Sequence, residues 1–174
     1  GRDLGSINDL YDPAFAGRVS MLTEMRDSAG LTMPGLGLDP TKVDEDGAME
    51  ALDKIAKANA AGQFRAFSGG EYLRSLESGD FVACIAWSGD IVQLQLERPD
   101  ISFVIPEEGT AMYMDCLCLP KGSPNPDAAY GLANHCLSIE GQQKIVEVLT
   151  QGITNLEAIK TTAPEHQAIY SYDD

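Results

Sequence analysis

The sequence predicts an α/β protein whose sheet is largely parallel. Short apolar runs alternate along the chain with amphipathic stretches, and strands separated by helices are typical of parallel sheets. An apolar content of 44% is sufficient for a hydrophobic core. The 174 residues suffice for one ordinary domain, or for one large lobe and part of another.

Each element is predicted from the spacing of its apolar residues and from turn residues at its ends. Strands are predicted at residues 18–22, 81–86, 101–105 and 112–119. Helices are predicted from about residue 26 to the glycine- and proline-rich segment 33–40, and at 44–59, 72–76, 89–96, 127–137 and 140–149. Ser138 suits the N-cap of the last helix. The final 20 residues have weak periodicity and receive no assignment.

The most informative stretch is residues 87–90, Trp-Ser-Gly-Asp, which closes the apolar run 81–86. It places the only tryptophan at the end of a buried strand, where ligands bind in α/β proteins. An indole there offers a flat face to an apolar or cationic ligand, whereas a tryptophan that only fills the core is the alternative. Acidic residues occur at 24 and 27, after one predicted strand, and at 115, within another. Aromatic faces with carboxylates predict a pocket that holds a cation without transforming it.

Missing motifs argue against several chemistries. The sequence has no P-loop, no G-x-G-x-x-G after a strand and no G-x-S-x-G elbow. Residues 42–53 resemble the spacing of an EF-hand calcium loop, but Lys42 occupies the first ligand position, where a carboxylate is needed, so this site is excluded. His135 and His166 are isolated from each other and from any motif. Glu24 and Asp27 leave an acidic hydrolase as an alternative, but no nucleophile or cofactor motif accompanies them. We therefore expect neither an enzyme nor a cofactor or metal site.

Charge and cysteine content narrow the choice of partners. A net charge of −15 argues against a nucleic-acid partner, whose phosphates require clustered Lys and Arg. No run of 18 apolar residues predicts a membrane span, and the polar start of the chain is unlike a signal peptide, so the start of any exported precursor would be missing. Cys84, Cys116 and Cys118 are expected as small buried residues within strands, and a disulfide from Cys136 remains open.

Seven short blocks of the sequence carry a resemblance to a known family. In order they are residues 9–19 (DLYDPAFAGRV), 21–27 (MLTEMRD), 67–72 (FSGGEY), 86–90 (AWSGD), 103–109 (FVIPEEG), 113–115 (YMD) and 119–122 (LPKG). Together they resemble the second-lobe and C-terminal portion of the spermidine/putrescine-binding family, the extracytoplasmic solute-binding subunits of ABC transporters, which include relatives that bind ω-amino acids. The resemblance runs from about residue 7 to about residue 149.

The resemblance implies a periplasmic-binding-protein-like (type II) clamp of two lobes, of which this chain is about one lobe plus part of the other. Residues 1–109 would form the second ligand-binding lobe, 110–150 would return to the first lobe, and 151–174 would cross again. With the N-terminal lobe missing, the returning strand and helices would expose an apolar face. The implied protein is periplasmic, and its membrane partner is an ABC permease.

The resemblance also implies roles for individual residues. Trp87 matches the aromatic platform of the family's pocket, and Asp115 matches a carboxylate that grips an amino group. Glu24 and Asp27 fall where the family keeps acids for the other end of a polyamine, and capping of the following helix is the alternative role. Tyr113 stands where a tryptophan is usual.

Two further positions bear on the ligand. Ser68 or Gly69 occupies a polar contact position of the family's pocket. Arg65 precedes them, and a guanidinium near the cleft would pair with a carboxylate but repel a diamine. An ω-amino acid such as γ-aminobutyrate is therefore the alternative to putrescine or spermidine, unless Arg65 is a surface residue. A part of a split or engineered ligand sensor is a further alternative.

Overall fold

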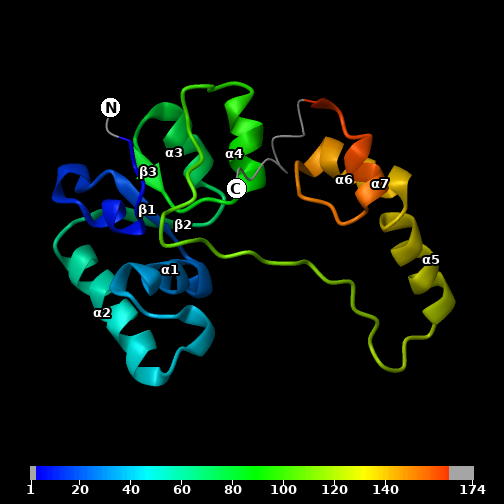
Figure 1. Ribbon diagram of the computed structural model, residues 1–174, viewed down its shortest axis with the longest axis horizontal. Coiled ribbons are helices and arrows are strands. Elements are labelled where there is room, and N and C mark those ends of the chain that lie inside the picture. Colours follow the sequence, from blue (N-terminus) through cyan, green and yellow to red (C-terminus); the bar gives the residue numbers. More distant parts are fainter. Residues whose placement is uncertain (1–2, 165–174) are drawn as a thin grey trace. The chain divides into compact units, whose positions relative to one another are not determined.

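A computed structural model describes residues 3–164 of the chain, which form α-helices, short 3₁₀ helices and one small parallel sheet (Figure 1). The strands are β1 Val19–Leu22, β2 Phe64–Ser68 and β3 Ala83–Cys84. The α-helices are α1 Met25–Thr32, α2 Glu45–Ala60, α3 Tyr72–Ser78, α4 Ser88–Gln95, α5 Pro126–Cys136, α6 Ile139–Leu149 and α7 Leu156–Lys160. Short 3₁₀ helices are η1 Ile7–Tyr11, η2 Pro13–Phe15, η3 Pro34–Leu36 and η4 Pro40–Lys42.

The sheet has the strand order β2-β1-β3, and both pairings are parallel, as the sequence predicts. All four residues of β1 are buried, which is usual for a central strand covered on both faces. The register shifts between Val19 and Ser20, whose partners are Phe64 and Ala66, so that Arg65 is the extra residue of a bulge in β2.

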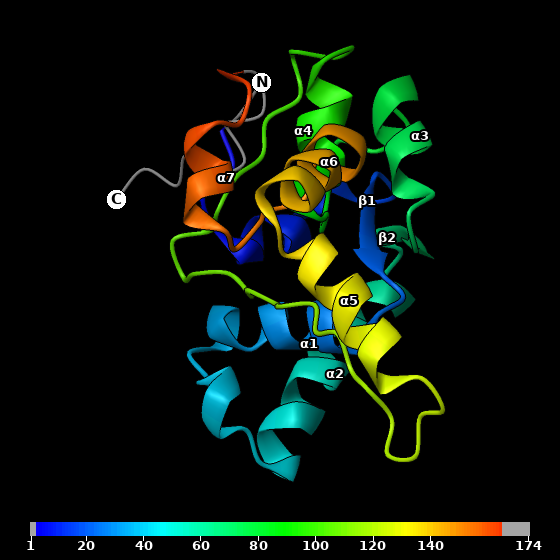
Figure 2. The same cartoon turned by 90° about the vertical axis from the view of Figure 1, so that its right-hand side faces the viewer.

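The predicted helices are present, and local capping explains where they begin. Asp44 is the N-cap of α2 and accepts a hydrogen bond from the Gly47 N–H at 2.8 Å, while two acids in the first turn suit the helix N-terminus. Ser138 caps α6 in the same way, as the sequence predicts. Helices α1 and α2 pack against each other beside the sheet (Figures 1 and 2).

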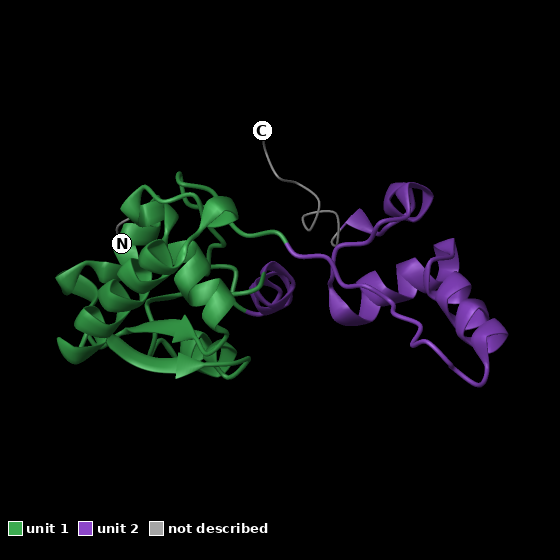
Figure 3. Ribbon diagram, turned by 90° about the horizontal axis from the view of Figure 1, so that it is seen from below, with its two compact units in different colours: residues 1–87, 98–112 green, residues 88–97, 113–174 purple. Residues whose placement is uncertain are grey.

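The chain divides into two units, which Figure 3 colours separately. Unit 1 comprises residues 1–87 and 98–112, and unit 2 comprises residues 88–97 and 113–174. The division of the chain into lobes at 1–109, 110–150 and 151–174 stays a prediction. Residues 165–174 of the last segment, with His166, lie outside the described residues.

Two segments of unit 1 that lie far apart in the sequence are joined by hydrogen bonds. The Glu107 N–H donates to the Gly5 carbonyl at 2.7 Å, and the Ile7 N–H donates to the Glu108 carboxylate at 3.1 Å. The Ser6 hydroxyl also donates to that carboxylate. Residues 5–7 and 107–108 are therefore fastened side by side. We call these bonds the staple.

Unit 2 has its own small apolar cluster. Val146, Ile153 and Ala158 are buried, with Val92 and Ile159 packed against them, so α4, α6 and α7 share this cluster.

Glycine is required at the start of α4, because a Cβ on Gly89 would lie 2.8 Å from the carbonyl oxygen of Thr150 at the end of α6. The Thr150 hydroxyl donates in turn to the Gly89 carbonyl at 3.2 Å.

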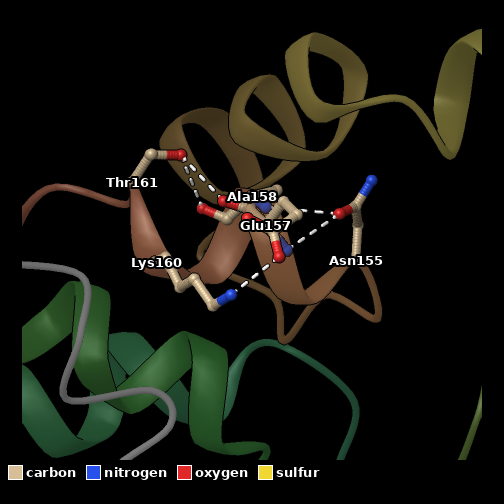
Figure 4. A network of polar contacts seen from close by, with 5 residues as sticks. All are labelled: Asn155, Glu157, Ala158, Lys160 and Thr161. Atoms are coloured by element: carbon tan, nitrogen blue, oxygen red, sulfur yellow. Dashed lines mark hydrogen bonds and ion pairs between the residues drawn. The ribbon is translucent and has the colours of Figure 1, made fainter.

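Helix α7, which the sequence does not predict, is held by a polar network (Figure 4). Asn155 is its N-cap, and its side-chain oxygen accepts from the Glu157 and Ala158 N–H groups. Lys160 forms an ion pair with Glu157 at 2.7 Å. The buried side chain of Gln142 connects α6 to the residues before α7, because its oxygen accepts from the Thr154 N–H at 2.9 Å.

The predicted strands at 101–105 and 112–119 are wrong, because the structure gives both segments no regular secondary structure. A strand requires a neighbour to satisfy its N–H and C=O groups, and none of the strands in residues 3–164 pairs with either segment. Cys116 and Cys118 are consequently exposed, which corrects the expectation that they are buried. Cys84 lies in β3 and Cys136 ends α5, and all four thiols are free.

Candidate ligand-binding site

Three of the predicted site residues lie at one edge of the sheet in unit 1. Glu24 follows β1, Ser68 is the last residue of β2, and Trp87 follows β3. Parallel strands end at the same edge, and the Thr23 N–H donates to the Ser68 carbonyl at 3.0 Å, which joins the ends of β1 and β2. The sheet therefore gathers residues that are up to 63 positions apart, from Glu24 to Trp87.

Asp27 and Trp87 are in direct contact. The indole N–H of Trp87 donates to Oδ2 of Asp27 at 3.2 Å, and both side chains are half-buried. Asp27 lies in the first turn of α1, where the helix N-terminus also favours a negative charge. An aromatic face and a carboxylate, the two features of a cation pocket, thus lie next to each other.

Glu24 has the capping role that the sequence offered as its alternative. It is the N-cap of α1, and its carboxylate accepts from the Arg26 N–H at 3.3 Å. The side chain remains exposed, so capping leaves its carboxylate open to solvent at the same sheet edge. A ligand role for Glu24 stays a prediction.

Ser68 is held by a buried serine of the central strand. The Ser20 hydroxyl oxygen lies 2.9 Å from that of Ser68, 3.1 Å from the Met21 carbonyl and 3.2 Å from the Ala66 carbonyl. Carbonyl oxygens only accept, so the arrangement is satisfied when the Ser20 hydrogen goes to a carbonyl and the Ser68 hydrogen goes to Ser20. Ser68 then presents lone pairs at the sheet edge.

Tyr72 contacts Trp87 through its hydroxyl group and through its ring. The backbone N–H of Trp87 donates to the Tyr72 hydroxyl at 3.1 Å, and the two rings meet edge to face with centroids 6.1 Å apart. Sequence reasoning missed both Tyr72 and Ser20. A polar residue within the buried run of β1 was a signal for Ser20, since buried hydroxyls need partners. Tyr72 ends the block 67–72, but nothing in the sequence indicated its contact with Trp87.

The remaining predicted residues lie elsewhere. Arg65 is the exposed bulge residue near the start of β2, three positions before Ser68. Tyr113 and Asp115 belong to unit 2, in the extended segment that follows residue 112, and both are exposed. Their roles at the ligand stay predictions.

Two further properties of residues 3–164 concern membrane spans and metal sites. No helix there combines the length and apolarity needed to cross a bilayer. In the same part of the chain, His, Cys, Asp and Glu side chains form no group of three that could hold a metal ion.

Comparison with known proteins identifies the family. The family model described as "Bacterial extracellular solute-binding protein" matches residues 2–168. A spermidine/putrescine-binding periplasmic protein of Haemophilus influenzae is 25% identical over 95% of this chain and 45% of its own length. The putrescine-binding periplasmic protein PotF of Escherichia coli is 31% identical over 68% of this chain and 34% of its own length. The chain thus spans about half the length, or less, of these relatives.

Solved structures agree on the fold. A spermidine/putrescine ABC transporter protein described as putative, from Listeria monocytogenes, matches 96% of this chain and 51% of its own with a TM-score of 0.86 at 23% identity. The spermidine/putrescine substrate-binding protein PotD of Streptococcus pneumoniae matches 98% of this chain and 53% of its own with a TM-score of 0.78 at 21% identity. These likenesses confirm the predicted periplasmic-binding-protein-like fold over about half of such a molecule, and the chain belongs to the bacterial extracellular solute-binding proteins.

Proposed function

We propose that this chain is part of the solute-binding subunit of an ABC importer and that it holds one side of a polyamine such as putrescine or spermidine. The observation that carries the proposal is the contact between the Trp87 indole and the Asp27 carboxylate at the sheet edge. An aromatic face can cover the methylenes of a polyamine, and a carboxylate can bind its ammonium group. The names of the curated relatives support the same ligand class.

The polarity of the edge favours an ammonium group over a carboxylate. Asp27 and Glu24 bring two carboxylates, and Ser68 presents lone pairs when its hydrogen is directed at Ser20, the arrangement that lets Ser20 donate to a carbonyl. Each of these groups accepts hydrogen bonds, and an ammonium group only donates them. The carboxylate of an ω-amino acid would need a cation, and Arg65, the predicted candidate, lies at the bulge near the start of β2.

The rest of the pocket is assigned on the family resemblance. Asp115 and Tyr113 would contact the ligand when the N-terminal lobe that the resemblance implies is present. The ligand would then touch both lobes and stabilise the closed clamp, which the permease recognises outside the cytoplasmic membrane. Binding by this chain alone would be weak, because ligand contacts on one lobe cannot favour closure.

Isothermal titration of the chain joined to its N-terminal lobe tests the proposal. Putrescine and spermidine should bind saturably and γ-aminobutyrate should not. Trp87→Ala should weaken putrescine binding about tenfold or more, as loss of an aromatic anchor does. Met49→Ala, on the exposed face of α2, is the matched control and should leave the affinity unchanged. Binding of γ-aminobutyrate alone, or of none of the three, would contradict the proposal.

A further inference from the structure

Trp87 is held through both of its nitrogen atoms. Its backbone N–H donates to the Tyr72 hydroxyl at 3.1 Å, and its indole N–H donates to Asp27 at 3.2 Å. The two acceptors come from different elements, since Tyr72 begins α3 and Asp27 lies in the first turn of α1. One bond fixes the backbone of the residue and the other fixes the orientation of its ring.

Tyr72 is well suited to act as the fixed point of this arrangement. Its side chain is completely buried, and it is the largest side chain in the chain with that property among the described residues. A ring enclosed on all sides has little freedom to move, so the position of its hydroxyl group is set by the core. The same ring supports the Trp87 ring edge to face.

We propose that Tyr72 is a positioning residue, which together with Asp27 orients the Trp87 indole before a ligand arrives. The inference rests on the proposed function, in which that indole is the ligand platform. A platform that is already ordered loses less conformational entropy on binding, which raises affinity without adding a contact.

The inference gives the Asp27 carboxylate two tasks. A carboxylate has about four lone-pair positions on two oxygens, so it can accept from the indole and from a ligand ammonium at the same time. Loss of the Asp27 charge and loss of the Asp27 acceptor should therefore have separable effects. Asn at this position keeps an acceptor oxygen without the charge, whereas Ala removes both.

Fluorescence of the sole tryptophan tests the positioning without any ligand. Tyr72→Phe keeps the ring and removes only the hydroxyl group. It should raise acrylamide quenching of Trp87 about twofold and lower its anisotropy. Tyr130→Phe, an exposed tyrosine of α5, is the matched control and should change neither. Unchanged quenching and anisotropy in Tyr72→Phe would overturn the inference.

The Asp27 variants provide a second test that does not depend on the core around Tyr72. Asp27→Ala should increase the quenching of Trp87, and Asp27→Asn should leave it close to that of the wild type. Equal quenching in both variants and the wild type would overturn the role of the indole hydrogen bond.

Titration with putrescine separates this inference from the proposed function. In the chain joined to its N-terminal lobe, Tyr72→Phe should weaken putrescine binding about fivefold while Tyr130→Phe does not. Normal binding with an unmoved Trp87 in Tyr72→Phe would overturn the inference and leave the proposed function standing. A wild-type protein that binds no polyamine, with a loosened Trp87 in Tyr72→Phe, would overturn the function and with it the ligand role of Tyr72.

Discussion

Strand β1 and residues 112–119 are both short apolar stretches, yet they have opposite surroundings. Val19 and Met21 of β1 are 0% exposed, whereas Met112 is 92% and Met114 is 72% exposed. The strand has a parallel neighbour on each side, and the segment pairs with none of the described strands. Apolar composition therefore indicates which residues can be buried, but a strand forms only where a partner supplies hydrogen bonds and a covering face.

Hydrogen exchange should show the largest difference between the two stretches. Backbone amides of β1 should exchange on the order of 10³-fold or more slowly than unstructured peptide, because exposing them requires opening the core. Amides of residues 114–119, which pair with none of the described strands, should exchange near the peptide rate. Protection of 114–119 that rises with protein concentration would contradict this expectation and indicate self-association. Joining the N-terminal lobe should protect this segment as well.

Thiol reactivity should distinguish the cysteines of residues 112–119 from the cysteine of β3. Cys116 and Cys118 are exposed and should react first with a thiol reagent at pH 8. Burial raises the pKa of Cys84 in β3 to about 12, so only about one molecule in 10⁴ carries the thiolate there at pH 8. Reaction of Cys84 as fast as Cys116 in the folded protein would contradict this burial.

The same pKa has a consequence for stability at alkaline pH. Below the unfolded pKa of 9.0 the Cys84 thiol is neutral in both states and favours neither. Between about 9 and about 12 the unfolded thiol releases its proton and the folded one keeps it, so stability falls as the pH rises. Cys84→Ala should lose less stability than the wild type across this window, measured by urea unfolding at pH 8 and pH 10.5 with Cys118→Ala as the control.

A pair of methionine truncations should give the smallest difference. Met21→Ala removes a completely buried side chain and should cost about 2–5 kcal/mol of unfolding free energy. Met114→Ala removes an exposed one and should change it by about 0.5 kcal/mol or less. Urea unfolding of both variants measures the two changes. Similar losses would mean that residue 114 is buried in solution.

Helices were more predictable from this sequence than strands, because the signals that begin a helix are local. Asp44 and Ser138 each accept from an N–H three residues on, within their own segment. The pairing of a strand depends on residues far along the chain. For that reason the sequence did not predict β2, which begins more than 40 residues after β1 and pairs with it directly. For the same reason a strand was predicted at 112–119, where no described strand pairs with the segment.

The residues of the candidate site also differ in how well the sequence predicts them. Residue type and position after a strand predict both Trp87 and Asp27 as site residues. The parallel pairing of β1 and β3 brings the two strand ends, and with them these residues, to the same edge of the sheet. Tyr72 and Ser20 act through other residues, by a hydroxyl that meets a backbone N–H or another hydroxyl. Such contacts depend on distances of about 3 Å between distant elements, which residue type alone does not predict.

The staple has a mechanical consequence for unit 1. Residues 5–7 lie near the start of this unit and residues 107–108 near its end, and the staple holds the two segments beside each other. Tension applied between these two segments would load the bonds at Gly5, Ser6 and Glu108 first. The three strands of the sheet would carry that load only after the staple had broken, so the staple shields the sheet edge that holds Trp87 from a pull on residues 109–112.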